Sequence, residues 1–154
     1  MIDINQITGS IIRAAITVHK TLGPGLLESV YEKCLAIELR QAGHVVHTQV
    51  PVRVEYGGEV ISEDGFRIDL LVDDIVIVEL KSVEQLKTVY SKQLLTYLRL
   101  AKKPVGLLIN FNVPLLKDGI ERIAASDLSI LGCDPAVSAE RSQHFCSVLS
   151  VSSV

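Results

Sequence analysis

Two short apolar runs on either side of an Asp-Asp pair constrain the fold of this chain more than any other feature. The runs cover residues 70–72 and 75–78, and β-branched residues dominate the second. Such runs flanking a short polar turn predict a β-hairpin. The predicted strands also contain three charged residues: Asp69, Glu79 and Lys81. Charged side chains are rarely buried unless they are paired or coordinated, so this hairpin needs a functional or a topological explanation.

The length of the turn decides whether these charges share a face of the sheet. With a two-residue loop, Asp69 and Glu79 would face opposite sides. A three-residue loop or a bulge between Val72 and Val76 sets Asp69 opposite Glu79, with Lys81 on the same face. We predict such an odd loop, because an Asp followed after nine residues by Glu-x-Lys is the spacing of a metal-dependent nuclease core. The alternative is a sheet edge whose charges prevent aggregation.

Composition narrows the class of protein. The chain has 154 residues, 48% of them hydrophobic and 21% charged, which predicts one stable globular domain. A net charge of −3 argues against a non-specific DNA binder but only weakly against a nuclease. The three cysteines form no Cys-x-x-Cys pair, which argues against a disulfide framework, a zinc site and an iron–sulfur cluster. We expect no membrane span, no signal peptide and a cytoplasmic location.

Two helices are predicted at the start of the chain. Residues 4–22 carry apolar side chains at spacings of three and four, and His19 lies near the end of this helix. We interpret His19 as a helix C-terminal residue favoured by the macrodipole rather than as a metal ligand. A Gly-Pro-Gly sequence then precedes a helix over residues 26–41, which carries Glu28 and Tyr31 on neighbouring surface positions. On local grounds alone, Glu28 is a capping-box residue.

The remaining elements follow from the same patterns. We expect strands over residues 45–56, from 59 through a kink at 64–65 into the Asp69 strand, 75–83 and 104–111, and helices over 84–100 and 115–124. Gln93 and Tyr97 lie one turn apart in the helix over 84–100, and Tyr97 is expected to lie partly in the core with its hydroxyl at the rim. Residues 1–125 form the domain. Residues 126–154, with eight serines, are expected to be a loosely packed or disordered tail.

Five motifs in this order resemble those of the GxxExxY family, a small bacterial and archaeal branch of the PD-(D/E)XK nuclease superfamily. They are Val18-His19-Lys20, Gly25-Leu26-Leu27-Glu28-Ser29-Val30-Tyr31, Asp69 with Glu79-Leu80-Lys81, Gln93-Leu94-Leu95-Thr96-Tyr97-Leu98, and Gly106-Leu107-Leu108-Ile109-Asn110-Phe111. The resemblance covers residues 4–124. Ile68 stands where the superfamily name has a proline, a departure that removes no ligand.

The resemblance implies an α/β (α+β) fold with a restriction-endonuclease-like core. Its mixed central sheet is flanked by helices in the order α-α-β-β-β-α-β-α, with Asp69 on the second core strand and Glu79 and Lys81 on the third. The Gln-x-x-x-Tyr motif formed by Gln93 and Tyr97 resembles the lambda-exonuclease-like branch. Some members of that branch carry a cysteine-bound iron–sulfur cluster, for which this chain lacks the cysteines.

The activity that the resemblance implies is hydrolysis of phosphodiester bonds in nucleic acid, with DNA favoured and Mg²⁺ or Mn²⁺ as the cofactor. The implied metal ligands are Asp69, Glu79, the Leu80 backbone carbonyl and, as an outer ligand or through water, Glu28. The implied catalytic set is Glu28, Asp69, Glu79 and Lys81, with Lys81 orienting the attacking water or stabilising the phosphate. Substrate-binding or supporting roles fall to Gln93, Tyr97, Tyr31 and His19.

Two other hypotheses remain open, because a fold does not fix a function. The chain could be a catalytically weak or inactive nuclease-fold module that binds nucleic acid or a protein partner, or a structural protein with an exposed apolar patch. Metal affinity separates the first of these from an active nuclease. Whether the chain forms a homodimer or acts with a partner protein also stays open.

Overall fold

The structure is a computed structural model that describes residues 3–127. In this part of the chain, five strands form one mixed sheet. The elements of this part are α1 (Ile4–Leu22), α2 (Glu28–Gln41), β1 (Val46–Tyr56), β2 (Glu59–Val72), β3 (Val76–Lys81), α3 (Thr88–Leu100), β4 (Val105–Asn110), the 3₁₀ helix η1 (Leu116–Gly119) and β5 (Ile120–Ala124). Within the same residues, none of the helices combines the length and the apolar character that crossing a membrane would require. All but the first two residues of the predicted 126–154 tail lie outside the described part.

The strands lie in the order β1-β2-β3-β4-β5. The β1–β2, β2–β3 and β4–β5 pairs are antiparallel, and β3 and β4 are parallel. A parallel pair needs a crossover connection, and α3 supplies it between β3 and β4. The predicted mixed sheet and the element order up to β4 are therefore confirmed.

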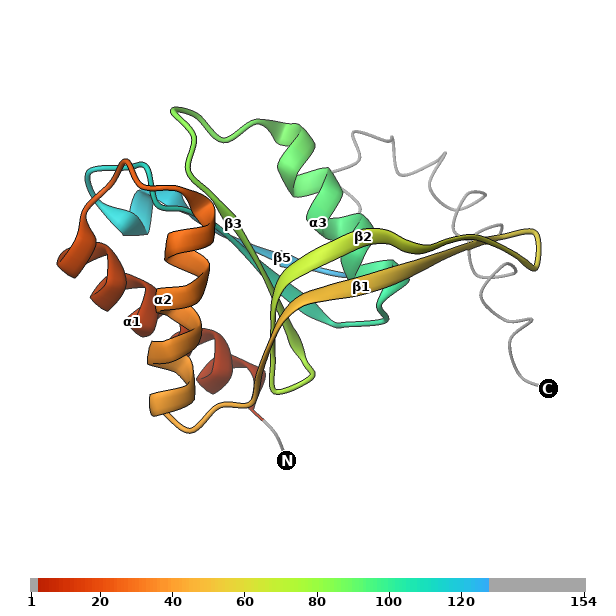
Figure 1. Cartoon of the computed structure of the whole chain (residues 1–154), viewed down its shortest axis with the longest axis horizontal. Helices are drawn as coiled ribbons and strands as arrows, with labels where there is room; N and C mark the ends of the chain where they lie inside the picture. Colours follow the sequence, from red (N-terminus) through yellow and green to blue (C-terminus); the bar gives the residue numbers. More distant parts are fainter. Residues whose placement is uncertain (1–2, 128–154) are drawn as a thin grey trace.

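Helices cover both faces of this sheet. Figure 1 shows α1 and α2 on one face and α3 on the other. One core cluster joins α1 and α2 to residues such as Leu70 and Val78, and the other joins α3 to residues such as Leu71 and Ile77. Because both faces are covered, β3 and β4 are buried along almost their whole length, which explains their continuous apolar sequences.

The helix predicted over residues 115–124 is wrong. One turn of 3₁₀ helix, η1, is followed by β5, which pairs antiparallel with β4. Ile120 and Ile123 are three residues apart, a spacing that also suits a helix, but the outer edge of β4 needs a strand to satisfy its backbone groups. Two other predicted helices begin later than expected, α2 at Glu28 rather than 26 and α3 at Thr88 rather than 84.

The predicted odd loop between β2 and β3 is confirmed. Val72 pairs with Val76, which leaves three residues in the loop. Asp73 and Asp74 have φ values of 53° and 59°, the left-handed region that Asp tolerates better than most residues. Asp73 also anchors the loop, because its carboxylate lies 2.6 Å from Nδ1 of His44, whose Nε2 lies 2.7 Å from Oγ of Ser10 in α1.

The β1–β2 pair extends beyond the rest of the sheet as a two-stranded ribbon (Figure 1). The predicted irregularity at residues 64–65 is present as a break in register, since Val52 pairs with Phe66 but Val54 pairs with Ser62. A Cβ at Gly65 would lie 2.5 Å from the Val54 side chain, so any other residue there would force Val54 or the strand to shift.

Candidate active site

The strands β2 and β3 separate where the predicted acids begin. Their paired residues end at Leu70 and Val78. Beyond this point the Leu80 N–H donates to Oδ2 of Asp69 at 2.8 Å, so a side-chain carboxylate takes the place of a strand carbonyl. Continued past the last pair, the register sets Asp69 opposite Glu79. The odd loop thus brings both acids to one fork between two strands.

Glu79 is the most buried of the acids at this fork. Its side chain accepts a hydrogen bond from Nζ of Lys81 at 3.3 Å through Oε1. Its Oε2 is buried and has no hydrogen-bond partner among the described residues. Burial, the largest cause, and the charge of Asp69 raise the pKa of Glu79 against the opposing effect of Lys81, to about 7. A buried, unpaired carboxylate oxygen is costly unless it gains a proton or a cation.

Lys81 is held from two directions. Besides its ion pair with Glu79, its Nζ lies 5.3 Å from the centroid of the Tyr90 ring, a cation–π contact from the first turns of α3. After β3, the amide of Asn110 binds both the N–H and the carbonyl of Val83, at 3.1 and 2.9 Å. Sequence reasoning assigned neither Tyr90 nor Asn110 a role at the site. Together they fix Lys81 and the segment that follows it.

Glu28 points to this same segment. It is the first residue of α2, and its Oε1 accepts a hydrogen bond from the Ser82 N–H at 3.3 Å. The capping-box interpretation is wrong, because Glu28 directly follows the N-cap residue Leu27, whereas a capping-box acid lies three residues after the cap. Burial is the main cause of the raised pKa of Asp69, as of Glu79, and the charge of Glu28 contributes to both. The chain therefore brings the helix acid and the strand acids within electrostatic reach of one another.

Tyr31 has a structural role beside Glu28. Its hydroxyl donates to the Gly23 carbonyl and accepts from the Leu26 N–H, and its ring stacks on Phe111 with centroids 4.3 Å apart. Between these anchors the chain turns through Gly25 at a φ of 96°, a conformation that disfavours other residues. In the Gly-x-x-Glu-x-x-Tyr sequence, the glycine thus lies in the loop, the glutamate is the acid that follows the loop, and the tyrosine holds the loop closed.

Gln93 and Tyr97 form a pair on α3. Nε2 of Gln93 donates to the Tyr97 hydroxyl at 2.8 Å. Tyr97 is only 4% exposed, more deeply in the core than expected. Burial, the largest cause, and the charges of Glu79 and Asp69 raise its pKa against the opposing hydrogen bond from Gln93, to about 12. The tyrosine hydroxyl therefore lies on the side of the acids.

His19 lies apart from this group. It is buried in the last turn of α1, and its Nε2 lies 2.7 Å from the Val113 carbonyl oxygen. This contact connects α1 to the segment between β4 and η1. His19 thus lies in the last turn of α1, where the sequence predicts a helix C-terminal residue.

Two polar residues that sequence reasoning missed border Asp69. Nε2 of Gln49 lies 2.7 Å from Oε2 of Glu32 and 3.5 Å from Oδ1 of Asp69. Burial raises the pKa of Glu32, and the charge of Asp69 contributes to the increase. Glu32 lies four residues after Glu28, on the same face of α2, and that spacing could have identified it. No pattern in the sequence marks Gln49.

The acids at the fork resemble a donor set for a divalent cation only in part. Between residues 3 and 127, no three His, Cys, Asp or Glu side chains are arranged to hold a metal ion. Mg²⁺ has a smaller requirement, because it takes one or two carboxylates and keeps several waters. Asp69 and Glu79 meet this requirement, and the unpaired Oε2 of Glu79 supplies a free lone-pair oxygen. These residues fit a cation held partly by water.

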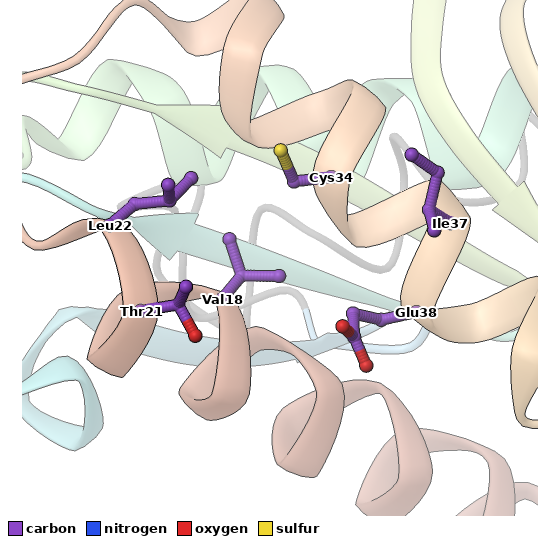
Figure 2. A pocket seen from close by; sticks show the side chains of 6 residues that line it. All are labelled: Val18, Thr21, Leu22, Cys34, Ile37 and Glu38. Atoms are coloured by element: carbon purple, nitrogen blue, oxygen red, sulfur yellow. The ribbon is translucent and has the colours of Figure 1, made fainter.

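A separate pocket lies between α1 and α2. Figure 2 shows the six residues that line it: Val18, Thr21, Leu22, Cys34, Ile37 and Glu38. None of them belongs to the acid group, and four are apolar or nearly so. The pocket therefore contributes nothing to the chemistry described above.

Comparison with known proteins identifies the family. No curated protein and no solved structure gives a significant match. A family model described as the PD-(D/E)XK nuclease superfamily matches residues 5–123. This span runs from α1 into β5 and includes every residue of the candidate site. The chain therefore belongs to the PD-(D/E)XK nuclease superfamily.

Proposed function

We propose that this protein is a divalent-metal-dependent nuclease that hydrolyses phosphodiester bonds, with DNA as the favoured substrate and Mg²⁺ or Mn²⁺ as the cofactor. Membership of the superfamily supports nuclease activity. The observation that carries the proposal is the buried Oε2 of Glu79, which has no hydrogen-bond partner within residues 3–127 and belongs to a side chain under the influence of the charges of Asp69 and Lys81. A buried carboxylate in that state is stabilised by pairing with a cation.

Different residues of the site would have different roles in the reaction. Asp69 and Glu79 would hold the cation, together with the Leu80 carbonyl, and Glu28 would approach it directly or through water. The bound cation would neutralise the phosphate and lower the pKa of a nearby water. Lys81, kept in place by Glu79 and Tyr90, would orient the attacking water or stabilise the charge that develops on the phosphate.

The resemblance to the GxxExxY family and to the lambda-exonuclease-like branch supports roles for two further residues. Gln93 and Tyr97 would contact the phosphate backbone or hold the metal shell in place. The chain is small and its net charge is −3, so a second copy or a partner protein would enlarge the surface that grips the substrate.

A cleavage panel tests the proposal. End-labelled single-stranded and duplex DNA and RNA are incubated with the protein in Mg²⁺ or Mn²⁺. We expect cleavage of at least one substrate, its loss in Lys81→Ala, and its retention in Lys117→Ala, which removes an exposed lysine of η1. Circular dichroism checks that each variant is folded. Cleavage that survives both Glu79→Ala and Lys81→Ala would remove these residues from the mechanism.

A second function is a nuclease-fold module that binds nucleic acid or a protein without cleaving. The observation that favours it is the lack, within residues 3–127, of a ready three-side-chain metal cluster. Calorimetry separates the two functions, because a binding module of this kind would show no affinity for Mn²⁺ in the range in which the active nuclease binds it.

A further inference from the structure

Gln49 has a backbone conformation that is unusual for its residue type and position. It lies within β1, yet its φ is 53°, in the left-handed region. Thr48 pairs with Leu70 and Val50 pairs with Ile68, so Gln49 lies opposite Asp69. A left-handed conformation costs free energy for any residue with a Cβ, and such costs gather at functional sites.

The side-chain amide of Gln49 lies between two carboxylates. Its two N–H groups can serve Glu32 at 2.7 Å and Asp69 at 3.5 Å, one each. The other oxygen of Asp69 already accepts from the Leu80 N–H. The Asp69 carboxylate is therefore held from both sides, by β3 through the backbone and by β1 through Gln49.

The same amide connects α2 to β2. Glu32 lies one turn after Glu28 on α2, so a bond to Glu32 also fixes the helix that presents Glu28. Glu32 and Asp69 are both acids and both partly buried, so without a donor between them their like charges would repel each other. Gln49 thus sets the separation between the acids of the helix and those of the strands.

A purely architectural role explains these facts less well. The side chain of Gln49 is exposed and packs into neither hydrophobic cluster. At a φ of 53°, glycine would give the same backbone path without strain. The contacts of the amide therefore account for the strained backbone of Gln49 better than packing does.

We propose that Gln49 is a positioning residue of the cation site, which orients Asp69 and sets its distance from the acids of α2. This inference rests on the proposed metal-dependent nuclease function. It assigns Gln49 no contact with the substrate or with the reacting atoms.

Two substitutions separate the amide from the backbone. Gln49→Gly relieves the strain and removes the amide, and Gln49→Asn tolerates the left-handed backbone but is one methylene too short to span both carboxylates. Thr48→Gly is the matched control, because it introduces glycine at an exposed neighbouring position of the same strand. Thermal unfolding is measured without metal, and Mn²⁺ affinity is measured by calorimetry on all four proteins.

We expect both Gln49 variants to unfold no lower than the wild type while binding Mn²⁺ about tenfold more weakly. Their kcat should fall, with KM for nucleic acid nearly unchanged. Thr48→Gly should unfold earlier and bind Mn²⁺ as the wild type does. Wild-type affinity in both Gln49 variants would overturn the inference alone, and so would a marked loss of thermal stability in both, because the role would then be structural. A wild type that neither binds Mn²⁺ nor cleaves would overturn the proposed function and this inference together.

Discussion

Replacing Glu79 by glutamine should make the metal-free protein more stable at alkaline pH. The wild-type side chain is 4% exposed, and its Oε2 has no hydrogen-bond partner within the described residues. Glutamine has nearly the same shape and keeps an oxygen that can accept from Lys81, but it carries no charge. The substitution therefore removes the cost of a buried carboxylate and leaves the packing almost unchanged.

The magnitude follows from the pKa of Glu79, which burial raises from 4.5 to about 7. Each pKa unit corresponds to about 1.4 kcal/mol, which gives an upper bound of about 3 kcal/mol. Below pH 4.5 the carboxyl is protonated in both the folded and the unfolded chain, so the variant gains nothing from this source. As the pH rises from 4.5 to 7 the wild type loses stability and the glutamine variant does not, so the gain reaches its full size above pH 7.

Thermal unfolding in a chelator at pH 5 and pH 8 measures the effect. A gain of about 1–3 kcal/mol corresponds to an increase in Tm of roughly 2–10 °C for a domain of this size. The control is Glu59→Gln, at an exposed position at the start of β2, which should change Tm little at either pH. An equal effect of Glu79→Gln at both pH values, or none at pH 8, would refute the reasoning.

Three further substitutions test the contacts that support the site. Tyr31→Phe removes the hydroxyl that closes the Gly-Pro-Gly loop, so it should cost about 1–2 kcal/mol in chemical denaturation and reduce cleavage. Asn110→Ala leaves the backbone after Lys81 without its side-chain partner, and it should cost about 1–3 kcal/mol and lower kcat; unchanged kcat would mean that this segment does not position the site. Asp73→Asn weakens the contact to His44, which lies away from the acids, so it should lower Tm while leaving Mn²⁺ affinity unchanged.

The sequence was sufficient for the central hairpin because side chains in a strand alternate between two faces. The need to bring Asp69 and Glu79 together fixed the parity of the loop, and the pairing of Val72 with Val76 agrees with it. The amphipathic helix over residues 4–22 and the buried strands were equally accessible, since their apolar spacing reports burial directly.

The predictions from the sequence were wrong or incomplete where long-range contacts decided between two local structures. The spacing of Ile120 and Ile123 suits a helix as well as a strand, and only the open edge of β4 selects the strand. Glu28 has the local signature of a capping residue, and only the position of Ser82 at the end of β3 gives it another partner. The role of Gln49 could not be predicted, because no residue pattern indicates a glutamine with a left-handed backbone within a strand.

The most direct test of the account is a calorimetric titration of Mn²⁺ into the wild type and Glu79→Gln at pH 8. We expect saturable binding to the wild type and at least a tenfold loss of affinity in the variant, because the variant lacks the buried Glu79 carboxylate oxygen that has no hydrogen-bond partner within residues 3–127. Equal affinity in the two proteins would contradict this expectation, since the cation would then bind without the Glu79 carboxylate at the fork between β2 and β3.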